Sequence, residues 1–243
     1  MGCFDDAREL LSHARHELPR IRKAYAESLE AKEVKGPLLV EIKNLLENLR
    51  SALDFAARGV FELHGSSAKA EPNIYFPYAR LDQTRLDFQK SQRIETCIPG
   101  LTKSRPDIVA AIMEMQHFGA KAYRWLPEFI DLNNENKHER LTPQTRRETK
   151  ELRISSGGTS ISMGEGTSIS MGPGTSMSFG GGGVIRGGQV FDVNRPPRVE
   201  GPASVEVIRW VSFHFDSNGQ PVISFLETAV EGVQSIVDEL HKL

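Results

Sequence analysis

The segment "DLNNENKHERL", residues 131–141, places amide and basic side chains where an apolar helix face should continue. An advance of 100° per residue puts Asn133 and Lys137 in the stripe that Phe129 and Ile130 begin. A buried amide or ammonium group is unfavourable unless it has a hydrogen-bond or charge partner. The segment therefore predicts either an interhelical clamp or a binding site.

The stretch "NLRSALDFAA" in the preceding helix offers the partners. Arg50 and Asp54 are four residues apart and share one helix face, beside its apolar stripe. In a structural interpretation, Asp54 pairs with Lys137, and Asn48 or Arg50 pairs with Asn133. Such contacts would fix the register of two packed helices.

A functional interpretation of the same residues is an anion site. Its binding residues would be Arg50, Asp54, Asn133, Lys137 and Arg140, with His138 as a candidate catalytic residue. Four side chains, Arg50, Lys137, His138 and Arg140, would surround a nucleotide or RNA phosphate, and Asp54 would orient one of them. A third interpretation is a solvated helix end, which applies if Pro127 rotates the helix.

These motifs also carry a resemblance. The "LRSALD" helix, the following "FP" loop and the "NxxKHxxL" pattern at residues 134–141 resemble a group of uncharacterised bacterial helical-bundle proteins. In that group the elements read Leu-Arg-Ser-Ala-Leu-Asp and Asp-Lys-His-Arg. The resemblance covers about residues 40–141 and implies a helical bundle. This chain departs from it at Asn136, which replaces the acidic residue, and at Glu139, which replaces the basic one.

A broader resemblance is to HEPN helical domains, whose active members are metal-independent ribonucleases. Their motif is an arginine followed after four to six residues by a histidine, near a dimer interface. The stretch "RGVFELH" contains Arg58 and His64, with Gly59 where a polar residue often follows the arginine. The resemblance implies that His64 is the general base and that Arg58 contacts the scissile phosphate. The alternative is that both residues stabilise the C-terminal end of their helix.

Composition excludes several classes of function. Of the 243 residues, 26% are charged and 39% are apolar, and the net charge is -2, which gives no general attraction to nucleic acid or acidic lipid. The absence of a long apolar run or a secretory signal predicts a cytoplasmic protein without a membrane partner. Cys3 and Cys97 do not make a disulfide framework or a metal cluster, and no motif indicates a cofactor or a metal.

The first 140 residues or so, which contain these candidate residues, are predicted to be mainly helical. Apolar spacing predicts helices over residues 5–32, with a kink or split at Pro19, and over 36–64. A short helix is expected at 81–97, another from Pro106, with a break at Pro127, and a last one to about 140. Helices with such short apolar stripes must pack on each other, which predicts a bundle of four or five helices.

The middle of the chain contains a repeat. "GTSISMGE", "GTSISMGP" and "GTSMSFGG" begin at Gly158, Gly166 and Gly174, a period of eight residues. Serine alternates with an apolar residue in each copy, which is typical of a strand, and the glycines supply turns. A meander, a small β-solenoid coil and a flexible linker all remain open. Further strands are expected at 184–185 and 190–193.

The last region predicts two strands, "ASVEVIRWVSFHF" and "PVISFL", joined by a Ser-Asn-Gly turn, and then an amphipathic helix over 227–243 that packs on the sheet. The predicted fold class is therefore α+β. An N-terminal antiparallel helical bundle at 1–150 precedes a β-rich region with a terminal helix at 151–243.

Three functions are compatible with this sequence. The first is a cytoplasmic interaction or regulatory protein with a phosphate-binding pocket in the bundle, whose partner is RNA or a nucleotide. The second is a HEPN-like ribonuclease. The third is a structural protein that assembles as a homodimer or a higher oligomer through the edges of its Ser/Thr repeat strands.

Overall fold

The structure is a computed structural model that describes residues 2–31, 36–70, 72–121, 123–138, 141 and 144–243. The side chains of residues 30, 31, 137, 138, 209 and 210 lie outside this description. The fold is α+β, as predicted, with helices first, antiparallel sheets in the middle and a terminal helix. The chain forms two compact units: a helical unit, which ends at Thr145 and resumes from His214 to Leu243, and a β unit, Arg146–Phe213.

The helical unit contains every described helix longer than three residues. Their bounds are α1 Cys3–Ala31, α2 Gly36–His64, α3 Arg85–Lys90, α4 Arg93–Cys97, α5 Leu101–Ser104, α6 Pro106–Glu114, α7 Trp125–His138 and α8 Val222–Lys242. None of these helices is both long enough and apolar enough to cross a lipid bilayer.

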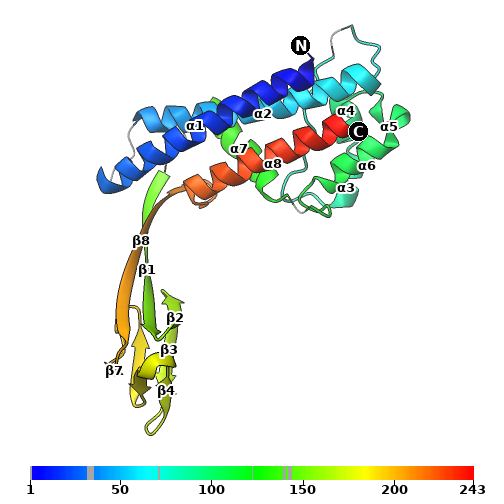
Figure 1. Cartoon of the computed structure of the whole chain (residues 1–243). Helices are drawn as coiled ribbons and strands as arrows, with labels where there is room; N and C mark the ends of the chain where they lie inside the picture. Colours follow the sequence, from blue (N-terminus) through cyan, green and yellow to red (C-terminus); the bar gives the residue numbers. More distant parts are fainter. Residues whose placement is uncertain (1, 32–35, 71, 122, 139–140, 142–143) are drawn as a thin grey trace. The chain divides into compact units, whose positions relative to one another are not determined.

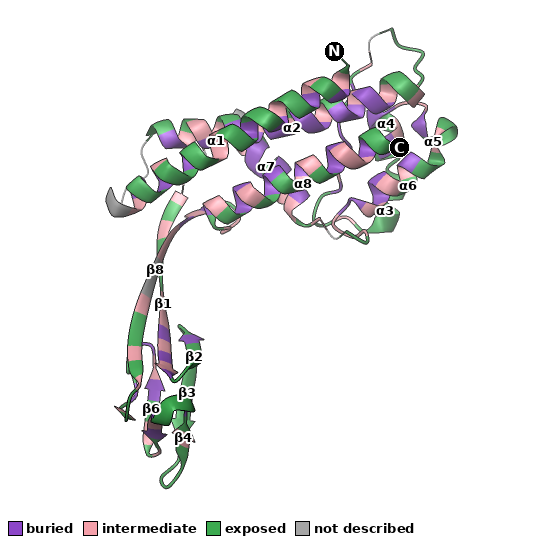
Figure 2. Ribbon diagram, viewed as in Figure 1, coloured by how far each residue is buried: buried purple, intermediate pink, exposed green. Residues whose placement is uncertain are grey.

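Three long helices form the body of the helical unit. The helices α1 and α2 form an antiparallel pair, and α8 lies against both of them (Figure 1). Buried and exposed residues alternate along all three, as expected for amphipathic helices that share one core (Figure 2). Gly59 allows the close approach of α1, because a side chain there would meet the ring of Phe4 at 2.6 Å.

The helix predictions are confirmed for the long elements. The helix α2 has the predicted bounds, and α1 continues through Pro19 without a split. The predicted helix at 81–97 is two short helices, α3 and α4, separated at Gln92, whose backbone is left-handed (φ 50°).

The predicted break at Pro127 is wrong. The helix that starts at Pro106 already ends at Glu114, and α7 starts at Trp125, so Pro127 lies in its first turn. A proline is tolerated there because the first backbone N–H groups of a helix have no partner within the helix.

The predicted C-terminal hairpin is also wrong. The strand β8 ends at Phe215, and a single bridge joins His214 to Pro221, after which α8 begins. Apolar residues from Val222 onward recur three and four residues apart and are buried, so "PVISFL" is the first turn and a half of a helix. The helix then packs on α1 and α2 rather than on a sheet. The structure thus groups residues 214–243 with the helices, which differs from the predicted division near residue 150.

The β unit is built from two long strands, β1 and β8, and six short ones, arranged in three antiparallel sheets. Their orders are β2-β1-β8, β3-β6 and β4-β5-β7. The bounds are β1 Gln144–Ser156, β2 Thr159–Gly164, β3 Ser168–Met171, β4 Ser176–Ser178, β5 Val184–Arg186, β6 Gln189–Asp192, β7 Val199–Glu200 and β8 Ser204–Phe215. The strands expected near 184–185 and 190–193 are therefore present as β5 and β6.

The three copies of the repeat are the strands β2, β3 and β4. They are not a linker, and they do not pair with one another as a meander would, because each pairs with a different strand: β1, β6 and β5 respectively. The glycine that opens each copy has a φ near +80°, as the turns require: +82° at Gly158, +82° at Gly166 and +79° at Gly174. The repeat of eight residues therefore reflects a glycine turn that recurs before each strand.

The alternating apolar residues of the repeat close a small core. Buried side chains from several of the strands meet in one cluster: Leu152, Ile154, Met163, Phe179, Ile185, Phe191 and Val193. Other apolar residues of the repeat, among them Ile161, Ile169, Met171 and Met177, pack against it. The serines between them face outward and are exposed. This core explains why the apolar positions of the three copies are so regular.

Candidate functional site

The inner face of α7 contains buried amides, as its sequence predicts. Asn133 is 5% exposed and Asn136 is 7% exposed, although both lie among apolar residues such as Phe129. The amide nitrogen of Asn136 donates to the carbonyl of Leu132 at 3.0 Å. The backbones of Lys137 and His138 belong to α7, but their side chains, and the whole of Arg140, lie outside the described residues.

Asp54 is the best-anchored residue of the predicted site. One carboxylate oxygen accepts a hydrogen bond from the backbone N–H of Phe76 at 2.9 Å. The other accepts one from Nε of Arg50 at 3.2 Å. The guanidinium of Arg50 also lies over the ring of Tyr78, 5.6 Å from its centroid. These contacts tie the "FPYA" segment, residues 76–79, to the face of α2.

Gln116 binds the same segment, a contact that was not predicted from the sequence. It is 1% exposed, and its side-chain oxygen accepts the backbone N–H of Ala79 at 2.8 Å. Its amide nitrogen donates to the carbonyls of Pro77 and Ile112. The sequence contained a signal, because Gln116 follows the buried residues Ile108 and Ile112 at steps of four, although α6 ends two residues before it, at Glu114.

The predicted contacts of Asn133 are not formed. Neither Asn48 nor Arg50 makes a hydrogen bond to it among the described residues, and Asn48 instead faces Nδ1 of His13 at 3.5 Å. Within the same described part of the chain, Oδ1 of Asn133 and Nη1 of Arg50 are buried without a hydrogen-bond partner. A buried polar atom that has no hydrogen bond to protein or water is in general unfavourable by about 1–3 kcal/mol.

The structure does not bring Arg58 and His64 together. Arg58 donates to Glu62 at 3.4 Å and to the carbonyl of Pro72 at 3.3 Å. The Nε2 atom of His64 lies 3.1 Å from Nη1 of Arg105. Because a guanidinium can only donate, Nε2 must accept, and the proton of a neutral His64 is then on Nδ1. The two residues that the HEPN motif would pair thus have different partners.

The described contacts of Asp54 and Gln116 are structural. Asp54 and Gln116 both satisfy backbone groups of residues 76–79, a segment that runs between helices without forming one. The binding of a phosphate by this site stays a prediction, and so does catalysis. The predicted binding residues are Arg50, Asp54, Asn133, Lys137 and Arg140, and the predicted catalytic residues are His138, His64 and Arg58. No group of three His, Cys, Asp or Glu side chains in the described residues is placed to hold a metal ion.

Comparisons with known proteins do not add to this picture. No family model matches the sequence, and no curated protein and no solved structure matches the chain.

Proposed function

We propose that this chain is an interaction protein that associates with a second copy of itself through the β unit. The observation that supports the proposal most directly is the position of the repeat. Each of its three strands, β2, β3 and β4, stands at the end of its sheet order and pairs on one side. An edge strand presents unpaired backbone N–H and C=O groups that can accept another strand.

The chemistry of this edge suits a second copy. Residues 158–182 contain a single charged side chain, Glu165, whereas edge strands commonly carry lysines that prevent pairing. The strand β2 is the longest of the three, with six residues, and Ser160 and Ser162 are exposed on it. Antiparallel pairing of β2 with β2 of another copy about a twofold axis would place like serines near each other, and hydroxyl pairs of this kind are favourable.

In this proposal the helical unit carries the β unit and takes no part in the contact between copies. We place the protein in the cytoplasm, because its two cysteines, Cys3 and Cys97, are free thiols and free thiols persist in a reducing compartment. Association of two copies requires neither a cofactor nor a catalytic residue.

The test uses charge to block and then restore the pairing. We expect the wild-type protein to shift from monomer to dimer with rising concentration in sedimentation velocity experiments. We expect Ser162→Lys and Ser162→Glu each to abolish the shift, because like charges would face each other across the new strand pair. An equimolar mixture of the two variants should associate again, and high salt should weaken that association.

The matched control is Ser51→Lys, which adds the same charge at an exposed position of α2. This variant should associate as the wild type does. A wild-type protein that remains monomeric at every concentration would refute the proposal. Association that survives both Ser162 variants would also refute it, because the contact would then lie elsewhere.

A further inference from the structure

A cavity of about 510 Å³ lies between the short helices of the helical unit. It is bounded by α3, the turn at Gln92, α4, α5 and α6. Pockets for small molecules typically have volumes of about 300–1,000 Å³. The cavity is separate from the cluster around Asp54 and from the β unit, so none of the contacts described above accounts for it.

The floor of the cavity is apolar. Phe88 is 1% exposed, Ile94 6% and Met113 5%, and the half-buried Val109 completes the floor. A ligand with an apolar body would pack on these side chains and remove from water the part of the floor that is still exposed, chiefly at Val109, which is favourable in proportion to the area covered. The floor therefore selects for an aromatic or short aliphatic body.

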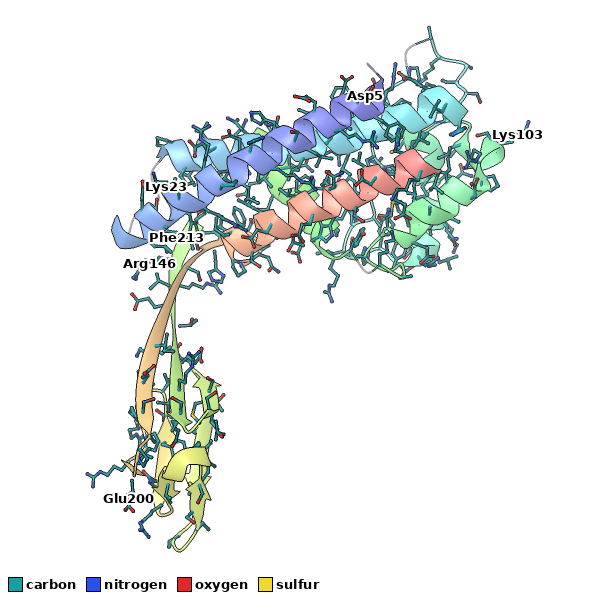
Figure 3. All side chains as sticks on the ribbon, viewed as in Figure 1. Asp5, Lys23, Lys103, Arg146, Glu200 and Phe213 are labelled. Atoms are coloured by element: carbon teal, nitrogen blue, oxygen red, sulfur yellow. The ribbon has the colours of Figure 1, made fainter. Side chains whose placement is uncertain are left out.

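The rim of the cavity is polar and carries excess positive charge. Arg93 from α4 and Lys103 from α5 both line it, are exposed and form no ion pair with the described residues. Lys103 projects from the surface of the helical unit at α5 (Figure 3). The one acidic residue of the rim is Glu95, so two basic groups face a single carboxylate.

The carboxylate of Glu95 already accepts hydrogen bonds from the protein backbone. The oxygens of Glu95 accept the backbone N–H groups of Gly100 at 2.6 Å and of Thr102 at 3.1 Å. Burial acts to raise the pKa of the Glu95 carboxyl, but these hydrogen bonds outweigh it and hold the pKa below its ordinary value. Glu95 therefore stays ionised and bound to the start of α5, and Arg93 and Lys103 remain available to an anion.

Gln92 adds a second distinctive feature to the rim. It is the one non-glycine residue in the described chain with a positive φ, and a backbone of this kind is strained by about 1–3 kcal/mol. Its carbonyl accepts hydrogen bonds from the backbone N–H and the hydroxyl of Thr96, which hold the turn in place. Strained residues of this kind are found more often at ligand sites than elsewhere.

We propose that this cavity binds a small amphipathic carboxylate. The apolar body of the ligand lies on Phe88, Ile94 and Met113, and its carboxylate is held by Arg93 and Lys103. The side-chain amides of Gln89 and Gln92 offer further hydrogen bonds at the rim. This inference is independent of the association through the β unit.

The test is a calorimetric titration of the full chain with 4-phenylbutyrate, compared with its neutral amide. We expect saturable binding of the acid, and binding of the amide weaker by roughly fivefold or more, because a charge-assisted hydrogen bond contributes at least that factor. Arg93→Gln and Lys103→Gln should each weaken binding of the acid to a similar degree. Val109→Trp should fill the cavity and abolish binding, with the melting temperature recorded on the same sample.

The control is Lys90→Gln, which removes a positive charge from the exposed end of α3, outside the cavity. It should bind the acid as the wild type does. The proposal is overturned if the wild type shows no saturable binding, if acid and amide bind equally, or if Val109→Trp binds with unchanged affinity. If binding is weakened by Lys90→Gln as much as by Arg93→Gln, the attraction is general and the site is likewise rejected.

Discussion

The carboxylate of Asp54, in the middle of α2, accepts the backbone N–H of Phe76 at 2.9 Å. The sequence indicates an ion pair for this carboxylate, and the structure adds a backbone group of a segment without regular structure. A backbone N–H removed from water is unfavourable unless it is paired, so Asp54 stabilises the path of the chain between α2 and α3. Gln116 does the same for Ala79, three residues later.

Replacement of Asp54 should therefore destabilise the helical unit. We expect Asp54→Ala to lower the free energy of unfolding by about 1.5–3 kcal/mol, the range for hydrogen bonds to charged groups. Asp54→Asn should lower it less, because an amide oxygen can still accept from Phe76. Urea denaturation measures both changes. The control is Asp82→Ala, since Asp82 is 70% exposed and its ion pair with Arg80 should contribute little.

The turns of the repeat make a prediction of a purely conformational kind. Gly166 has a φ of +82°, and a Cβ atom there would meet no atom within 4 Å. We expect Gly166→Ala to destabilise the β unit by about 1–2 kcal/mol, because only the left-handed backbone is unfavourable for alanine. Gly164→Ala is the matched control, since that glycine is equally open but has no positive φ. Denaturation curves in which the two variants are equally stable would contradict the prediction.

The sequence predicts the long helices well and the short elements poorly. Apolar residues at helical spacing fix the bounds of α2, and the period-two alternation identifies the strands of the repeat. Strand pairing is not encoded locally in the same way, because the partners of β3 and β4 lie in segments with no repeat signal of their own. A short apolar run such as "PVISFL" fits a strand or a helix equally, and only its continuation to residue 240 decides between them.

The candidate site shows a similar division. Burial of Asn133 follows from the phase of α7 and is confirmed. The partners of Asp54 and Gln116 are backbone groups of residues 76–79, and no pattern of side-chain types predicts which backbone groups a tertiary fold leaves unpaired. The sequence therefore predicts which polar residues are buried better than it predicts their partners.

The pH dependence of stability should reveal a carboxyl group that the fold desolvates. Burial raises the pKa of Glu128 above its ordinary value of 4.5, and Asp131 adds to the effect while Arg124 opposes it. A raised pKa means that the fold favours the neutral acid, a contribution that is full below pH 4.5 and is lost as the pH rises through the folded pKa. We therefore expect Glu128→Gln to be more stable than the wild type at pH 7, with the difference vanishing at low pH.

The control for this prediction is Asp82, a carboxyl group whose pKa is shifted in the opposite direction. The hydrogen bond from Arg80 lowers the pKa of Asp82, although slight burial opposes it, so Asp82→Asn should not stabilise the protein at pH 7. Thermal melts of the three proteins across the acidic range measure the effect. A Glu128→Gln variant with no advantage at neutral pH would show that the carboxylate is well solvated.

The packing of α8 on α7 can be tested by adding one methyl group at Gly232. A Cβ atom on Gly232 would lie 2.2 Å from Cζ2 of Trp125, so the indole occupies the space that a side chain would need. We expect Gly232→Ala to lower the free energy of unfolding by about 1–3 kcal/mol, despite the better helix propensity of alanine, because overpacking forces the ring to move. In a Trp125→Leu background the same change should instead stabilise the protein, by up to about 1 kcal/mol, because propensity alone then acts. Glu231→Ala, at the exposed neighbouring position, is the control. Equal effects of Gly232→Ala in the two backgrounds would mean that α8 does not pack on Trp125.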